Sequence, residues 1–471
     1  MPVWSIDEIV VQTDGALLQG NPQQQVRAVS TDSRQMPDEA LFVALQGERF
    51  DGHDFAATAL QNGAVAVLGS DHERLTSLCR SAVREDAAVV HVPDTLLALQ
   101  ALARAQRRRF QGTVVAITGS NGKTTVKEMT SAVLHQRLAT FRSPGNLNNH
   151  IGLPLTLLQM PLSTEVAVCE MGMNHLGEIR QLCSIAQPHL GVVTNVALAH
   201  VGYLGSIEQV QQAKGELIEA LDADGIAIVN ADDPRTYELG QRAAGRVITF
   251  GQGEAAVVRG RVQADHGLAG VQCDVLLDGA AWDVRLAIPG VHNVMNALAA
   301  AAVGVALEIP APDIVAGLQN YKGMYGRMAI RSGQAGVTLI DDTYNANPES
   351  MRAALQFLAG VPDAGQRVAV LGDMLELGDA AVALHHEIGS FARQCGVDRL
   401  ITLGPLSRSM AEGAREAGMA ARQIHCAVDQ QGALAMLQKL LRPGDVVVLK
   451  GSRGMAMEHL VKALAADREG A

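Results

Sequence analysis

The sequence of 471 residues has little of what marks secreted, membrane-spanning or disulfide-stabilised proteins. Its six cysteines are scattered without a C-x-x-C pair, which argues against a zinc ribbon and against a disulfide framework. The most apolar long run, "ALAAAAVGVALEIP", is shorter than the roughly 20 residues that a bilayer-spanning helix needs. The N-terminal stretch carries acidic residues and no basic region, unlike a secretory signal. We therefore expect a cytoplasmic protein without membrane insertion.

The sequence also lacks an excess of basic over acidic residues. The formal net charge is −11, and charges of both signs are interspersed along the chain. The compact basic run Arg107–Arg109 follows an apolar, helix-like stretch, which is more typical of a solvated helix end than of a binding patch. We therefore expect no nucleic-acid partner.

Apolar residues make up 48% of the sequence, which is enough for several packed cores. Short apolar, β-branched runs such as "TVVAIT", "GIAIVN" and "RVAVLG" alternate with helix-like segments almost throughout. Unbroken apolar strands separated by helices indicate parallel sheets buried on both faces, and therefore an α/β fold. At roughly 100–200 residues per domain we expect three domains, spanning residues 1–92, 93–312 and 313–471. Within the second domain, residues 257–290 read as a β meander.

The stretch "VVAITGSNGKTTVKEM" resembles a phosphate-binding loop but departs from the pattern G-x-x-x-x-G-K-[ST]. The first required glycine would fall at position 117, which is Ile117. The strand, glycine turn, Lys-Thr pair and helix are nevertheless in the order that such a loop requires. An ordinary turn with an exposed lysine is the alternative. We favour a phosphate loop in which Lys123 supplies positive charge and Thr124 can bind Mg²⁺.

Three further residues suggest a metal–phosphate site. Glu170 ends the buried strand "EVAVCE", at the edge of a parallel sheet where ligands bind. His200 follows another strand end, a position at which a histidine can equally be structural. Lys214 lies seven residues from both Ile207 and Leu221, on the apolar face of a helix. It is either a lysine with a buried stem or a desolvated amine that can take up CO₂ as a carbamate.

Together these motifs resemble the Mur ligase family, the ATP-dependent amide-forming enzymes of peptidoglycan precursor synthesis. The family's short loop T-G-x-N-G-K-T is present as "TGSNGKT", and its N-x-x-x-x-H segment is present as "NVALAH". The resemblance covers essentially the whole chain. It implies a central P-loop-type parallel-sheet ATPase domain followed by a Rossmann-like C-terminal domain, and it favours the carbamate at Lys214.

The resemblance also implies roles for individual residues. Contacts to ATP would come from Gly119, Ser120, Asn121, Gly122, Lys123, Thr124, Thr125, Asn293, Asn296, Arg327 and Asp342, with Asp341 as the alternative to Asp342. The UDP-sugar substrate would be held by Ser33, Arg34, Glu48, Arg49 and Phe50 in the N-terminal domain, and by Asn146, Asn148, Asn149 and Arg180 in the central domain. Catalysis would depend on Lys123, Glu170, His200, Lys214 and Arg327.

The C-terminal stretches "DDTYNANPESM", "LGDMLELG" and "LKGSRGM" resemble the family member that adds D-alanyl-D-alanine. The D-N-P-R motif of the meso-diaminopimelate-adding member is absent. The resemblance therefore implies ligation of D-alanyl-D-alanine to UDP-N-acetylmuramoyl-tripeptide through an acyl phosphate, the last cytoplasmic step of precursor synthesis. Asn345 and Asn347 would contact the incoming dipeptide.

The implied cofactors are ATP and two Mg²⁺ ions. Thr124 and Glu170 would hold one ion, and His200 and carbamylated Lys214 would hold the other. The protein would be a monomer whose C-terminal domain closes before chemistry. The alternatives are a regulatory or transport P-loop NTPase, a ligase similar to folylpolyglutamate synthetase, and a non-catalytic protein that binds nucleotide sugars.

Overall fold

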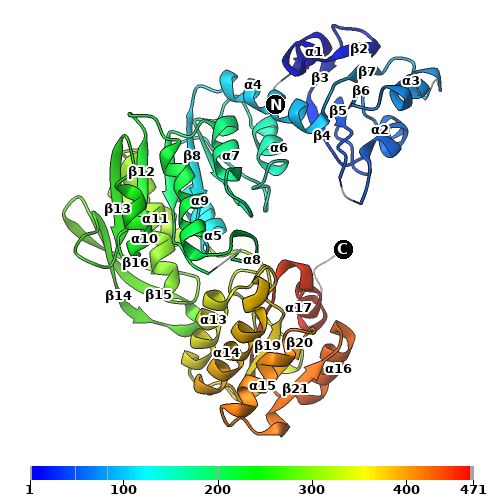
Figure 1. Cartoon of the computed structure of the whole chain (residues 1–471). Coiled ribbons are helices and arrows are strands. Elements are labelled where there is room, and N and C mark those ends of the chain that lie inside the picture. The colour runs from blue at the N-terminus through cyan, green and yellow to red at the C-terminus, as the bar shows by residue number, and fades with distance from the viewer. Residues whose placement is uncertain (1–2, 48, 82, 199–200, 467–471) are drawn as a thin grey trace.

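The chain forms three consecutive α/β units in the computed structural model, which describes residues 3–47, 49–81, 83–198 and 201–466. Figure 1 shows the N-terminal unit in blue, the central unit in cyan to green, and the C-terminal unit in yellow to red. Each unit is built on its own sheet. The predicted α/β class with three domains is therefore confirmed.

The N-terminal unit contains a five-stranded sheet in the order β2-β7-β6-β5-β4, in which only β2 runs antiparallel to its neighbour. Its strands are β2 (Ala16–Gln19), β4 (Ala28–Ser30), β5 (Ala40–Val43), β6 (Ala66–Gly69) and β7 (Ala88–His91). A short ribbon pairs β1 (Trp4–Ser5) with β3 (Gln25–Val26). The helices are α1 (Ile6–Thr13), α2 (Ala56–Gln61) and α3 (His72–Arg80).

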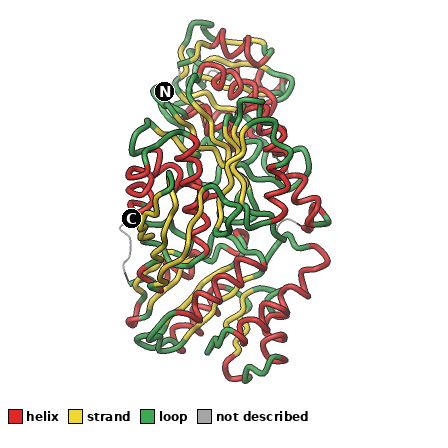
Figure 2. The backbone as a smooth tube through the Cα atoms, turned by 90° about the vertical axis from the view of Figure 1, so that its left-hand side faces the viewer, coloured by secondary structure: helices red, strands yellow, loops and turns green. Residues whose placement is uncertain are grey.

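A nine-stranded sheet in the order β16-β15-β14-β13-β12-β11-β8-β10-β9 forms the central unit. Its strands are β8 (Thr113–Thr118), β9 (Thr140–Arg142), β10 (Val166–Glu170), β11 (Leu190–Val193), β12 (Ile226–Asn230), β13 (Arg246–Gly251), β14 (Val258–Asp265), β15 (Val271–Leu277) and β16 (Ala280–Leu286). Strands β8 to β13 run parallel to one another, and β14 to β16 form the predicted antiparallel meander. Figure 2 shows these strands along the middle of the molecule with helices on either side.

Alternate residues of β8 explain why both faces of the central sheet are covered. Val115 and Ile117 pack with α5 (Lys123–Leu134), α11 (His292–Ala306) and α12 (Ala311–Asn320). Val114 and Ala116 pack on the opposite face with α4 (Thr95–Arg109), α6 (Gly152–Gln159), α7 (Glu178–Ala186), α9 (Ile207–Glu219) and α10 (Pro234–Gly240). The short helix α8 (Val201–Leu204) precedes α9. A strand buried on both faces reads as an unbroken apolar run, as "TVVAIT" does.

The C-terminal unit has a six-stranded sheet in the order β17-β18-β22-β19-β20-β21, parallel except for β17. Its strands are β17 (Ala329–Ser332), β18 (Thr338–Asp342), β19 (Arg367–Gly372), β20 (Arg399–Leu403), β21 (Ile424–Ala427) and β22 (Val446–Lys450). One face packs against α13 (Pro348–Gly360), α14 (Ala381–Gln394) and α15 (Arg408–Glu416), and the other against α16 (Gln430–Leu440) and α17 (Glu458–Leu464). Strand β22 is inserted between β18 and β19, so the last strand of the described chain lies at the centre of this sheet.

Two details of the sequence prediction need adjustment. The predicted strand "LGVVTNV" ends earlier, at Val193, because Asn195 turns toward the phosphate loop and accepts hydrogen bonds from the backbone N–H groups of Ser120 and Asn121. The expected boundary between residues 312 and 313 falls inside α12, whose Ile314 packs in the central core. We therefore propose that the C-terminal unit begins after α12.

Within the described residues, no helix is long and apolar enough to cross a membrane.

Candidate active site

The glycine turn between β8 and α5 adopts the geometry of a phosphate-binding loop. Gly122, which precedes the first helical residue Lys123, has a φ of +82°, and Gly119 has a φ of +150°. A Cβ atom on Gly119 would lie 1.8 Å from Thr194 Oγ1, so no larger residue fits there. Ile117 is fully buried within β8. The position that breaks the general pattern thus belongs to the strand, and the turn begins at Gly119.

Lys123 is folded back over this turn. Its Nζ donates hydrogen bonds to Gly119 O at 2.6 Å and to Ser120 O at 3.3 Å. Burial lowers the pKa of Lys123, while the Glu170 carboxylate acts in the opposite direction. The helix N-terminus and the lysine together provide positive charge where a polyphosphate would lie.

Glu170 has a carboxylate oxygen that accepts no hydrogen bond from the described residues and lies 3.9 Å from the Lys127 ammonium. The residue ends β10 and is 1% exposed. Its Oε1 accepts a hydrogen bond from Asn148 Nδ2 at 2.8 Å, while Oε2 has no hydrogen-bond partner among the described residues. A buried carboxylate oxygen without a donor is costly unless a cation binds it. Oxygen ligands of this kind suit Mg²⁺, so the residues present fit the metal.

Thr124 and Arg327 connect the phosphate loop to the C-terminal side of the site. Thr124 Oγ1 accepts a hydrogen bond from Arg327 Nη2 at 3.0 Å. The guanidinium of Arg327 stacks on the Tyr344 ring, 3.9 Å from its centroid. Arg327 is therefore held beside the loop, where it can neutralise phosphate charge.

Lys127 was missed by the sequence analysis although it lies one helical turn after Lys123. It is fully buried, and its Nζ donates hydrogen bonds to Ser143 O at 2.9 Å and to Gly145 O at 3.0 Å. The same ammonium lies 3.9 Å from Glu170 Oε2. Lys127 thus fixes the loop that carries Asn146, Asn148 and Asn149.

Lys214 lies on the buried face of α9, as its spacing predicted, and is 1% exposed. Burial lowers its pKa well below the usual value, and the positive charge of Lys123 lowers it further. No carboxylate of the described residues is among the groups that shift this pKa. His200, its expected partner, lies outside the described residues, and the rest of the described chain holds no cluster of three metal-binding side chains.

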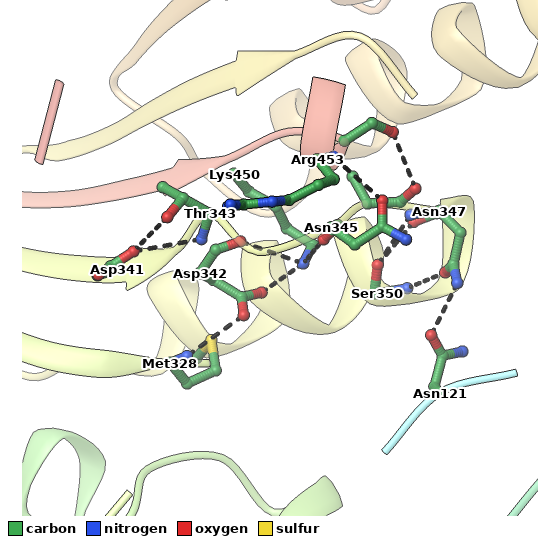
Figure 3. A network of polar contacts seen from close by, with 12 residues as sticks. Asn121, Met328, Asp341, Asp342, Thr343, Asn345, Asn347, Ser350, Lys450 and Arg453 are labelled. Carbon is green, nitrogen blue, oxygen red and sulfur yellow. Dashed lines mark hydrogen bonds and ion pairs between the residues drawn. The ribbon is translucent and has the colours of Figure 1, made fainter. Parts of the chain in front are cut away.

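The two aspartates at the end of β18, which the sequence left as alternatives, make different contacts (Figure 3). Asp341 accepts hydrogen bonds from Gly326 N and from both the N–H and the hydroxyl of Thr343, and so stabilises a turn. Asp342 lines the cavity, and its Oδ2 lies 2.5 Å from Lys450 Nζ. Lys450 also donates to Asn345 O at 2.9 Å. The side chain near the cavity is therefore Asp342, held by a lysine that the sequence analysis did not single out.

Asn347 joins the C-terminal unit directly to the phosphate loop (Figure 3). Its Oδ1 accepts a hydrogen bond from Ser350 N, which caps α13. Its Nδ2 donates to Asn121 Oδ1 at 2.7 Å. The loop that we expected to contact the dipeptide therefore also contacts the nucleotide loop.

These groups surround one cavity of about 600 Å³ between the central and C-terminal units. The expected site residues that line it are Ser120, Asn121, Gly122, Lys123, Thr125, Asn146, Asn148, Asn149, Glu170, Asn293, Asn296, Arg327, Asp342, Asn345 and Asn347. Asn293 and Asn296 are hydrogen-bonded to each other at the start of α11, and Asn296 packs against Gly122. Residues from six segments of the sequence thus meet at one place.

Other expected site residues lie elsewhere. Gly119 and Thr124 are not among the residues that line the cavity, and neither is Arg180, which pairs with Glu219. In the N-terminal unit, Ser33 is buried, whereas Arg34, Arg49 and Phe50 are exposed, Phe50 to 72%. Glu48 lies outside the described residues. A substrate that touched both groups would have to extend from the cavity to the N-terminal unit.

Comparisons with known proteins match models of one family in all three units of the chain. Family models match for the Mur ligase catalytic domain over residues 25–107, the Mur ligase middle domain over 117–304, and the Mur ligase glutamate ligase domain over 326–453. The UDP-N-acetylmuramoyl-tripeptide–D-alanyl-D-alanine ligase of Bacillus subtilis is 38% identical over 98% of each chain.

Solved structures show the same similarity. MurF from Acinetobacter baumannii superposes with a TM-score of 0.86 at 34% identity, covering 98% of this chain and 99% of that one. MurF ligase from Thermotoga maritima, solved in complex with ADP, has a TM-score of 0.78 at 29% identity and covers 93% of this chain and 96% of its own. The similarity includes all three units.

Proposed function

The chain belongs to the Mur ligase family, and we infer that it joins D-alanyl-D-alanine to UDP-N-acetylmuramoyl-tripeptide at the expense of ATP. The product is the pentapeptide precursor of peptidoglycan. The observation that carries this assignment is the cavity in which the phosphate loop faces the Asp342–Asn347 segment. Similarity over all three units supports it, because a ligase of this kind needs a site for each of its three substrates.

The reaction must first activate a carboxylate, since joining it to an amine in water is uphill. The γ-phosphoryl group of ATP passes to a carboxylate oxygen of the tripeptide, ADP leaves, and an acyl phosphate forms. The dipeptide amine then attacks the acyl carbon, a C–N bond forms, the C–O bond to phosphate breaks, and the amine loses a proton. No covalent enzyme intermediate is needed, so the protein contributes positioning and charge stabilisation.

The phosphate loop and Arg327 supply that charge stabilisation in our proposal. The N–H groups at the start of α5 and the ammonium of Lys123 would hold the phosphates, with Arg327 on the opposite side. Asn293, Asn296 and Asp342 would complete the nucleotide site. Bound Mg²⁺ would screen the γ-phosphate charge, with Thr124 and Glu170 as its ligands.

A second metal position would be formed by His200 and Lys214. A neutral amine can add to CO₂, and the buried environment of Lys214 favours the neutral form. An N–C bond forms, the nitrogen loses one proton to solvent, and the neutral amine becomes a carbamate anion that can bind a metal ion. In this proposal the second metal ion would lie near the tripeptide carboxylate that becomes phosphorylated.

The tripeptide substrate would extend toward the N-terminal unit. We propose that Ser33, Arg34, Glu48, Arg49 and Phe50 hold its UDP-sugar, and that Asn146, Asn148, Asn149 and Arg180 hold the intervening part. Asn345 and Asn347 would face the dipeptide. We further propose a monomer that works in the cytoplasm.

Phosphate release from ATP tests the proposed function directly. We expect release only when UDP-N-acetylmuramoyl-tripeptide and D-alanyl-D-alanine are both present. The Lys123→Ala variant is the control, because it lacks the charge that stabilises the transferring phosphoryl group. Release without either substrate would instead indicate a regulatory or transport NTPase, and use of a single amino acid would indicate a different ligase.

A further inference from the structure

Resting on the proposed function, we propose that Arg453 binds the carboxylate of the incoming dipeptide and so determines which amines the enzyme accepts. The dipeptide has an amine that reacts and a carboxylate that must stay unreacted at its other end. An anion entering a partly buried site needs a cationic partner, or it loses the solvation it had in water. The cationic side chains of the cavity can be compared one by one.

Lysine and arginine line the cavity at four positions of the described chain, namely Lys123, Arg327, Lys450 and Arg453. Lys123 is folded over the phosphate turn, and Arg327 is hydrogen-bonded to Thr124 at the start of α5. Both therefore lie at the nucleotide end. Lys450 is fully buried and ion-paired with Asp342 at 2.5 Å, so its charge is already neutralised. Arg453 is the remaining candidate.

The guanidinium of Arg453 also has one edge that is available to bind a carboxylate. Its side chain is 60% exposed, and its Nη1 pairs with Glu458 Oε1 at 2.9 Å. Among the described residues, neither Nε nor Nη2 makes a hydrogen bond. These two nitrogens lie on one side of the planar guanidinium, the side that binds both oxygens of a carboxylate at once. Glu458 thus fixes one end of the group and leaves a bidentate edge available.

The position of Arg453 in the fold supports the same assignment. The residue follows β22 at the carboxyl ends of the parallel strands, where ligands bind in open α/β sheets. Its backbone N–H donates to Asn345 Oδ1 at 3.3 Å, so the segment that we expect to contact the dipeptide holds Arg453 in place (Figure 3). The Tyr344 ring lies 5.8 Å from its guanidinium carbon. Asn345 and Arg453 therefore form one surface facing the cavity.

The experiment compares D-alanyl-D-alanine with its C-terminal amide, which keeps the reacting amine and loses the negative charge. We expect the unmodified enzyme to prefer the carboxylate by about 10- to 100-fold in kcat/KM. In Arg453→Met the preference should fall to near one, because only the carboxylate substrate loses a partner. The KM for ATP should not change, and Arg453→Lys should keep part of the preference.

Arg352 provides a matched control. It also pairs with a glutamate, Glu387 at 3.1 Å, and lies over an aromatic ring, Phe391, but it does not line the cavity. Arg352→Met should therefore retain the full preference. Arg453→Gln serves as a second variant if Arg453→Met does not fold.

Two results would overturn the proposal. One is an Arg453 variant that still discriminates against the amide as the unmodified enzyme does. The other is an unmodified enzyme that uses both dipeptides equally well. If the unmodified enzyme joins neither dipeptide to the tripeptide substrate, the proposed function itself is wrong, and the assignment of Arg453 is wrong with it.

Discussion

Two buried lysines in different units of the molecule have opposite surroundings. Lys450, at the end of β22 in the C-terminal unit, is 3% exposed and lies 2.5 Å from the Asp342 carboxylate. Lys214, on α9 in the central unit, is 1% exposed, and the charge that shifts its pKa is the like charge of Lys123. Burial lowers the pKa of both, but only Lys450 has a carboxylate that opposes this effect.

The difference teaches that burial alone does not define the role of a lysine. A buried ammonium with a close carboxylate is stable as an ion pair and can hold a loop in place. A buried amine without one is driven toward its neutral, nucleophilic form. We therefore regard Lys450 as a positioning residue and Lys214 as a reactive one.

The largest expected effect is at Lys214. Lys214→Ala should lower the ligation rate by about three orders of magnitude, because the variant cannot form the carbamate that we propose as a metal ligand. Acetate or formate should restore part of the rate by occupying the space of the carbamate. Steady-state rates with increasing acetate measure this. Lys214→Met leaves no such space and should not be rescued, and full activity of Lys214→Ala would remove the carbamate from the mechanism.

Removal of Lys450 should act on stability instead. Lys450→Met leaves Asp342 buried without its counter-charge, which costs about 3 kcal/mol. Hydrogen exchange of the backbone amides in β18 and β22 would measure the loss locally. Adding Asp342→Asn should recover most of it, because the unpaired charge is gone. An equal loss in the single and double variants would mean that the ion pair is not what stabilises this end of the sheet.

A smaller effect is expected at the contact between the two units. Asn347→Ser keeps a residue that caps α13 but is too short to donate to Asn121. Losing that one hydrogen bond should lower kcat/KM for ATP about fivefold, with little change in stability. Asn347→Ala should additionally destabilise α13 by about 1 kcal/mol. An unchanged kcat/KM in the serine variant would show that the contact does not help to order the loop.

The smallest effect is expected at an exposed ion pair in the N-terminal unit. The side chain and backbone of Arg34 lower the pKa of Asp32 to about 2. Since this is below the unfolded value of 3.8, the pair stabilises the folded state above about pH 4, and the contribution disappears as the pH falls through about 2. Both side chains are largely exposed, 45% for Asp32 and 84% for Arg34, so Asp32→Asn should lower the melting temperature by less than about 2 °C at pH 7. A larger shift, or one that persists at pH 2, would contradict this ranking.

The sequence predicted the central unit in most detail because its signals are local. "TVVAIT" is a strand of this unit with the predicted limits, and Glu170 and Lys214 have the predicted positions on a strand end and on a buried helix face. In each case a stretch of about ten residues or fewer carries the signal, as an unbroken apolar run for a strand buried on both faces or as the apolar spacing of a helix. The catalytic and binding roles assigned to these residues stay predictions.

Lys450, Arg453 and Lys127 were missed for the opposite reason. The partners of Lys450 are more than 100 residues away, and the two meet only because β22 is inserted beside β18. Strand order depends on packing of the whole unit, which a local pattern does not contain. Likewise, the hydrogen bonds of the Lys127 ammonium depend on the path of the loop at Ser143–Gly145.

The close contact between Gly119 and Thr194 also limits how resistance to an inhibitor could arise. Every other amino acid at position 119 would place a Cβ atom on the Thr194 hydroxyl, and the conformation of the turn disfavours side chains as well. A compound held by the backbone N–H groups of this turn therefore meets a surface that substitution cannot reshape without damaging the enzyme.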